Sequence, residues 1–187
     1  MDTLMDFTNN TVDLNELPKF EDANLTKIHP SYLKIVMFNI ALFYGIFAIA
    51  AGLAFYYFPE IRPYWLLVSL VYAFLVIVSI TVSYISFKNK SFAFRTHDVI
   101  YRTGAIAITT TIIPYNRVQH AAIHEGFLSR RFGLAKVEIF TAGGVSSDIK
   151  IPGLEKGLAE KVRYLVMGKI DNSKEEEKNA GQPEEQL

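Results

Sequence analysis

The chain has 187 residues, of which 50% are hydrophobic, with 19 basic side chains, 19 acidic side chains and no cysteine. This composition excludes a disordered or fibrous protein, and the missing cysteine excludes disulfides and thiolate metal sites. The charges are unevenly distributed: residues 35–87 carry one acidic and one basic group, whereas residues 88–170 carry 13 basic and 6 acidic groups. The chain therefore has an apolar middle and a basic second half.

Two long uncharged segments predict helices that cross a membrane. Residues 35–58 and 65–87 contain no charged side chain. A helix of either length is roughly 35 Å long, which is enough to cross a hydrocarbon core of about 30 Å. The connection at 59–64 is too short for anything but an antiparallel hairpin. We therefore expect a transmembrane helical hairpin at 33–87, after a polar N-terminal cytoplasmic segment at 1–32.

Basic residues near the ends of this hairpin predict its orientation. The connecting loop contains only Arg62, whereas seven lysines and arginines lie on the side of the two termini, and cytoplasmic loops carry the excess of basic residues. We therefore expect a multi-pass protein with both termini in the cytoplasm. The seven residues are Lys19, Lys27, Lys34, Lys88, Lys90, Arg95 and Arg102.

Small residues recur along one face of the first span, at Ala41, Gly45, Ala48 and Gly52. Such residues let membrane helices approach closely, so this face is expected to close the hairpin, with a homo-oligomer contact as the alternative. Neither span contains an ionisable acid or base of the kind that marks a transport path. A transporter or channel built from this chain alone is therefore not expected.

Residues 88–170 predict a small antiparallel β domain that ends in a helix. Turn signals about 8–12 residues apart separate six or seven short alternating strands, one of which places Ile106, Ile108 and Ile112 on one face. Helical spacing then relates Leu154, Leu158, Val162, Leu165 and Val166. This is the outline of a pleckstrin-homology-like (PH-like) barrel or sandwich capped by a helix, and thus of an α+β membrane protein. The acidic tail at 171–187 is expected to be disordered.

Three motifs in this half resemble the bacterial PH-domain membrane proteins of the YdbS-like type. They are IPYNRVQH at 113–120, GFLSRRFGLA at 126–135 and IFTAGG at 139–144, and the resemblance extends over about residues 30–170. Family members usually have proline at the position of Phe127. The resemblance implies a bacterial cytoplasmic (inner) membrane and a partnership with a longer membrane protein that bears several such domains. It implies no established reaction or ligand.

The densest basic group in the β domain predicts a binding surface. Arg117, Arg130 and Arg131 are expected to lie together, with the aromatic side chains Phe127 and Phe132 between them in the sequence. Mixed aromatic and arginine side chains are typical of protein interface cores, so we favour a protein partner. The alternatives are the anionic lipid headgroups of the inner leaflet and an ordinary solvated loop.

Other patterns that suggest chemistry are weaker. His120 and His124 have the spacing of a metal-binding pair on a helix, but on a strand they are about 13 Å apart, too far for one metal ion. Gly143 and Gly144 predict a hairpin turn rather than a phosphate loop. The sequence contains no G-x-S-x-G motif and no RNA-binding aromatic pattern. It therefore predicts a non-enzymatic binding protein without a catalytic residue, metal, cofactor or nucleic-acid partner.

Overall fold

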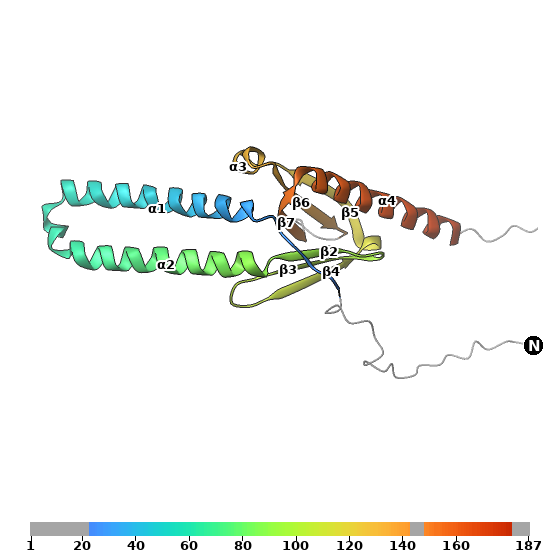
Figure 1. Cartoon of the computed structure of the whole chain (residues 1–187), viewed down its shortest axis with the longest axis horizontal. Coiled ribbons are helices and arrows are strands. Elements are labelled where there is room, and N and C mark those ends of the chain that lie inside the picture. The colour runs from blue at the N-terminus through green and yellow to red at the C-terminus, as the bar shows by residue number, and fades with distance from the viewer. Residues whose placement is uncertain (1–22, 143–147, 181–187) are drawn as a thin grey trace, which may run out of the picture.

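The computed structural model describes residues 23–142 and 148–180, the last ten of them by their backbone alone. A long helical hairpin projects from one end of a β-rich domain, and a further helix lies along that domain (Figure 1). The predicted α+β architecture is confirmed. The predicted turn at Gly143 and Gly144 lies outside the described residues.

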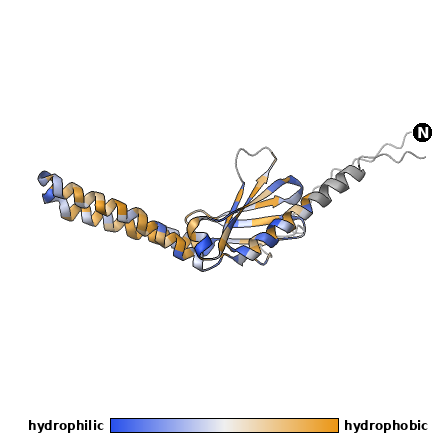
Figure 2. Ribbon diagram, turned by 90° about the horizontal axis from the view of Figure 1, so that it is seen from above, coloured by the Kyte–Doolittle hydropathy of each residue, from blue (hydrophilic) through white to orange (hydrophobic). Residues whose placement is uncertain are grey.

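The hairpin consists of α1 (Ser31–Tyr57), the 3₁₀ turn η2 (Pro59–Tyr64) and α2 (Trp65–Asn89). Both long helices are apolar and long enough to cross a membrane, and at most 6% of their most apolar stretch is buried. Apolar residues cover the hairpin along most of its length, and polar residues gather at its tip (Figure 2). A helix that is apolar on all sides and unburied by protein needs an apolar solvent, which a lipid bilayer supplies.

Tyrosine side chains hold the two helices together. The Tyr44 hydroxyl lies 2.6 Å from that of Ser79, and the Tyr72 hydroxyl donates a hydrogen bond to the Tyr44 carbonyl oxygen at 2.8 Å. The predicted small-residue contact does not close the hairpin. A Cβ added at Gly45 or Gly52 would meet nothing within 4 Å, and Gly52 borders a gap of about 240 Å³ between the helices.

Seven described strands form two antiparallel sheets. The first sheet has the order β1-β2-β3-β4 and the second the order β5-β6-β7. A 3₁₀ turn, η3, connects the sheets, a short helix, α3, connects β5 to β6, and α4 follows β7. The bounds are β1 (Thr26–Lys27), β2 (Ser91–Phe94), β3 (Asp98–Thr103), β4 (Thr109–Pro114), η3 (Tyr115–Arg117), β5 (Val118–His124), α3 (Phe127–Arg131), β6 (Leu134–Thr141), β7 (Ile149–Glu155) and α4 (Lys156–Ala180).

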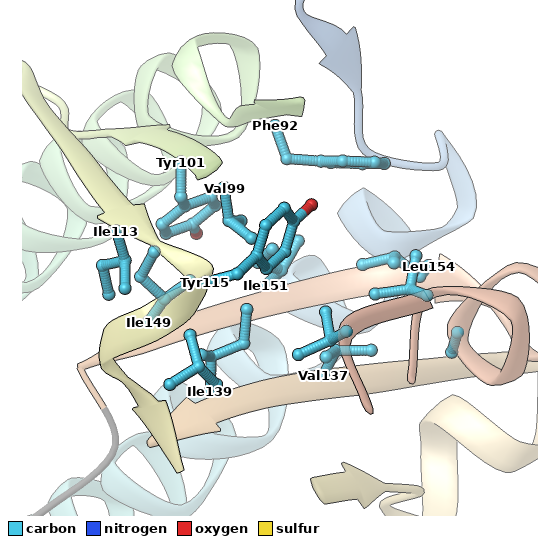
Figure 3. Packing of buried hydrophobic residues seen from close by; sticks show 14 of the residues in the cluster. Phe92, Val99, Tyr101, Ile113, Tyr115, Val137, Ile139, Ile149, Ile151 and Leu154 are labelled. Carbon is cyan, nitrogen blue, oxygen red and sulfur yellow. The ribbon is translucent and has the colours of Figure 1, made fainter. Parts of the chain in front are cut away.

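The hydrophobic core fills the space between the two sheets and α4. Side chains from β3 and β4 point toward those from β6 and β7, as Figure 3 shows. Val99, Val137, Ile139 and Ile151 are fully buried. The predicted period of two in β6 and β7 correctly places Val137, Ile139 and Ile151 in the core. Val99 belongs to β3, where three consecutive residues are buried.

The position of α4 differs from the prediction in two respects. Leu154 belongs to β7, and Leu158 and Leu165 are about 40% exposed. The predicted Val162 and Val166 are buried in the core, together with Ala159, which was not predicted. The helical period was correct, but the buried stripe is turned by about one residue around the axis. The helix also continues to Ala180 and includes the first ten residues of the tail that was expected to be disordered.

The face of β4 that was predicted from its isoleucines is not the face that enters the core. The strand begins only at Thr109, and Ile113 pairs with Val99 of β3 in the core. Ile112 consequently lies on the opposite face and is 41% exposed, and Ile106 and Ile108 precede the strand.

The N-terminal segment is part of the β domain, which corrects the predicted boundary at residue 32. Thr26 and Lys27 pair with β2, and Ile28 is buried in the core. The His29 amide donates a hydrogen bond to the carbonyl oxygen of Gly153 in β7, at 2.9 Å. The domain is therefore built from chain segments on both sides of the helical hairpin.

Candidate binding surface

The short helix α3 presents an aromatic ring and two arginines on one side. Phe127, Arg130 and Arg131 follow one another at i, i+3 and i+4, so they share a helix face. The Phe127 side chain is 80% exposed and that of Phe132, immediately after the helix, is 41% exposed. We call these four residues the α3 surface.

Neither arginine of the α3 surface has a compensating charge nearby. Within the described part of the chain, no salt bridge joins Arg130 or Arg131 to a carboxylate, and both residues are exposed. Arg130 and Arg131 are consecutive residues in the last turn of α3, where the helix dipole favours positive charge. The α3 surface therefore offers two free cations beside an exposed aromatic ring.

Arg117 does not belong to this surface, which corrects the predicted group of three arginines. It ends η3, before the first residue of β5, whereas α3 follows the last residue of β5. Seven strand residues separate the two positions, a distance of about 20 Å. Arg117 instead lies beside Ala142, whose amide donates a hydrogen bond to the Arg117 carbonyl oxygen at 3.1 Å. The prediction failed because sequence proximity does not account for the length of an intervening strand.

The helix α3 lies level with the start of α1. A cleft of about 420 Å³ separates the two helices, with Tyr32, Ile35 and Asn39 of α1 on one side and Gly126 and Ser129 on the other. In Figure 1, α3 lies above the first turns of α1, at the end of the domain from which the hairpin projects. The helix α3 is therefore close to the boundary between the domain and the apolar helices, and Ser129 rather than the α3 surface lines the cleft.

Gly153 fixes this arrangement of helix and domain. Its φ of +68° lies in the left-handed region, and a Cβ at this position would approach the Tyr32 side chain to 2.7 Å. Glycine is required on both grounds, because other residues disfavour this backbone conformation and would collide with the ring. The close contact holds the first turn of α1 against β7.

Charged residues that line the cleft are already paired. Lys136 Nζ lies 2.6 Å from Glu138 Oε1, and His124 Nε2 lies 3.3 Å from Glu138 Oε2. The hydrogen bond from Lys136 lowers the pKa of the Glu138 carboxyl, and Lys156 pairs with Glu125 at 3.0 Å. The cleft therefore has little net charge of its own, in contrast to the arginines of the α3 surface.

The two histidines of β5 have separate protein contacts. His120 stacks on the ring of Phe140, with centroids 4.3 Å apart, and His124 faces Glu138. Among the described residues, no group of three or more histidine, aspartate or glutamate side chains could hold a metal ion. Both histidines therefore contribute to the structure of the β5–β6 pair.

Sequence reasoning missed the loop that joins β3 to β4. Ile106 is 95% exposed there, and Asn89 at the end of α2 donates a hydrogen bond from Nδ2 to the carbonyl oxygen of Gly104 at 3.1 Å. Gly104 was the signal that could have revealed this loop, because a glycine directly after β3 and before the isoleucines indicates a turn.

Comparison with known proteins identifies the family. The family model described as bacterial PH domain matches residues 32–170. The chain is 32% identical over 102 residues to the UPF0699 transmembrane protein YdbS of Bacillus subtilis (strain 168), a match that covers 54% of this chain and 58% of the relative. No solved structure gave a significant match. The two apolar helices and the transmembrane relative support membrane association. The chain belongs to the bacterial PH domain family.

Proposed function

We propose that this chain is a non-enzymatic assembly subunit of a bacterial membrane protein complex, and that its α3 surface binds a protein partner. The observation that carries the proposal is the 80% exposure of Phe127 beside two arginines that form no ion pair with the carboxylates of the described residues. An aromatic ring flanked by arginine is the combination that most often supplies the binding energy at protein interfaces.

The charge distribution supports an orientation with both termini and the PH-like domain in the cytoplasm. Three basic residues lie where the helices meet the domain, namely Lys34, Lys88 and Lys90, whereas Arg62 is the only basic residue at the tip of the hairpin. Arg62 donates hydrogen bonds to the carbonyl oxygens of Phe55 and Tyr56, at 3.0 and 3.2 Å. Its guanidinium group therefore also pairs carbonyl oxygens in the last turn of α1. An excess of lysine and arginine marks the cytoplasmic side.

The position of the α3 surface narrows the class of partner. Because it lies level with the first turns of α1, a partner that itself emerges from the same membrane can reach it without an extended linker. The partner expected from the family resemblance, a longer membrane protein with several PH-like domains, fits this geometry. We therefore propose a partner of this class.

A second candidate function is the binding of anionic lipid headgroups. It is favoured by the two exposed arginines of α3, the helix at the end of the domain from which the hairpin projects, because neither forms an ion pair within the described residues. Such contacts contribute about 1 kcal/mol per charge near an anionic surface. The two hypotheses differ in whether the aromatic rings or the charges supply most of the affinity.

Three variants of the full-length protein separate these hypotheses. Phe127→Ala with Phe132→Ala removes the rings, Arg130→Ala with Arg131→Ala removes the charges, and Arg117→Ala is a matched arginine control at the far end of β5. Each protein is purified in mild detergent after its melting temperature is checked. Co-purifying proteins and anionic lipids are then quantified by mass spectrometry.

We expect the aromatic variant to lose its protein partner and the Arg117→Ala control to retain it. The proposal fails if the aromatic variant keeps every partner. If the arginine variant then also loses bound anionic lipid, by up to roughly 30-fold in affinity for two charges, the lipid hypothesis replaces it.

A further inference from the structure

The loop between β3 and β4 carries two isoleucines that the domain does not bury. Ile106 is 95% exposed and Ile108 is 50% exposed. The alanines beside them, Ala105 and Ala107, are also apolar. A contiguous run of four apolar residues at the end of a hairpin has no role in the core of this domain. It indicates a contact with something outside the described residues.

The loop lies where α2 leaves the apolar region. Asn89 Nδ2 donates a hydrogen bond to the Gly104 carbonyl oxygen at 3.1 Å, and Asn89 is two residues beyond Phe87, the end of the uncharged segment. At 1.5 Å per residue, Asn89, which binds the start of the loop, is about 3 Å along the helix axis from that end. In Figure 1 the loop extends alongside the last turns of α2, in the direction of the hairpin.

The backbone of the loop holds this projecting shape. Gly104 has a φ of +134°, and a Cβ there would lie 1.9 Å from the Ala107 carbonyl oxygen. No other residue fits this turn without displacing the backbone. The turn therefore presents the side chain of Ile106 away from the two strands, as its exposure shows.

Basic side chains surround the base of the loop. Arg102 is the second-last residue of β3, Lys88 and Lys90 lie in and after the last turn of α2, and Lys27 lies on β1, where its Nζ donates a hydrogen bond to the Lys88 carbonyl oxygen. Apolar residues that project beyond a group of lysine and arginine residues match the cytoplasmic interface of a bilayer, in which acyl chains lie beneath anionic headgroups.

We propose that the loop at residues 104–108 inserts into the cytoplasmic leaflet of the membrane, with Ile106 and Ile108 among the acyl chains. The bilayer is the expected occupant because the adjacent helix enters it within a few residues of the loop. The insertion lies beside α2, whereas the α3 surface lies beside α1. It would fix the tilt of the domain on the membrane, and it holds whether or not the α3 surface binds a partner.

The absence of cysteine from the chain allows a direct test. Ile106→Cys is labelled with an environment-sensitive fluorophore in the full-length protein, which is reconstituted in vesicles of phosphatidylethanolamine and phosphatidylglycerol at a low protein-to-lipid ratio. Asn116→Cys, an exposed position in η3 beyond the other end of β4, is the matched control. Both labels are then challenged with lipids that carry a quencher on the acyl chain.

The proposal predicts a blue-shifted, several-fold brighter emission at position 106 than at position 116, with quenching by the acyl-chain lipids at position 106 alone. Equal, water-like emission at both positions would overturn it. A blue shift at position 106 that resists lipid quenching and grows with the protein-to-lipid ratio would also overturn it, because it would identify a second protein copy as the occupant.

Discussion

The Nζ of Lys27 donates a hydrogen bond to the carbonyl oxygen of Lys88 at 2.9 Å, across 61 residues of chain. This contact joins the strand before the helical hairpin to the last turn of the helix after it. The neighbouring Ile28 is 4% exposed in the core. The hairpin is therefore an insertion within the first sheet, and the spacing of the two helix ends is set by the domain itself.

This arrangement predicts that Ile28 contributes to the stability of the whole domain. Ile28→Ala leaves a cavity in the core and should lower the free energy of unfolding by about 2–5 kcal/mol. Thr26→Ala, at an exposed position in the adjacent strand β1, should have little effect. Thermal unfolding of the two full-length variants in detergent checks this. Equal melting temperatures would contradict the role given to the N-terminal segment.

Tyr115 predicts a loss of stability in alkali. Burial, with a smaller effect of the Asp98 charge, raises the pKa of its hydroxyl from 10.0 to about 12, and the hydroxyl donates a hydrogen bond to the Arg95 carbonyl oxygen at 3.0 Å. Because the folded state favours the protonated form, its stabilising contribution is complete below pH 10 and declines as the pH rises toward about 12.

The substitution Tyr115→Phe keeps the buried ring and removes the titrating group. It should lower stability at neutral pH by about 1 kcal/mol for the lost hydrogen bond. It should also reduce the fall in melting temperature between pH 10 and about 12. A variant whose melting temperature falls with pH as steeply as that of the unchanged protein would exclude Tyr115 as the source.

The carboxyl of Glu138 predicts a loss of stability in acid, in contrast to the effect of Tyr115 in alkali. The hydrogen bond from Lys136 lowers the pKa of this carboxyl below 4.5, so its contribution is present above that pH and is lost as the pH falls through the lower folded value. Glu138→Gln should be less stable than the unchanged protein at neutral pH and less sensitive to acid below pH 4.5. Melting temperatures measured between pH 3 and 7 provide the check, and an unaltered acid response would refute it.

Local patterns predicted the parts of the structure that depend on neighbours in the sequence. The uncharged segments identified both apolar helices, because a bilayer-spanning helix is specified by length and the absence of charge alone. The association of Phe127 with Arg130 and Arg131 was also correct, since all three lie within five residues of one helix.

The errors concern contacts between distant segments. Nothing in the sequence of Thr26 and Lys27 indicates that they pair with β2, because a two-residue strand has no readable period. The separation of Arg117 from Arg130 depends on the full length of β5, and the exposure of Ile112 depends on which face of β4 meets Val137 and Ile139 in the other sheet. The pairing of β1, the position of Arg117 and the exposure of Ile112 are set by how the strands and the two sheets pack, which local sequence patterns do not specify.

The central proposal, that the α3 surface binds a membrane protein partner, is tested most directly by cross-linking in living cells. A photoreactive benzoyl-phenylalanine replaces Phe127 in the full-length protein, and a second variant carries it at Asn116, which is exposed at the far end of β5. We predict a discrete covalent adduct at position 127 that contains a second protein with PH-like domains, and no such adduct at position 116. Lipid adducts alone at position 127, or the same protein adducts at both positions, would contradict the proposal.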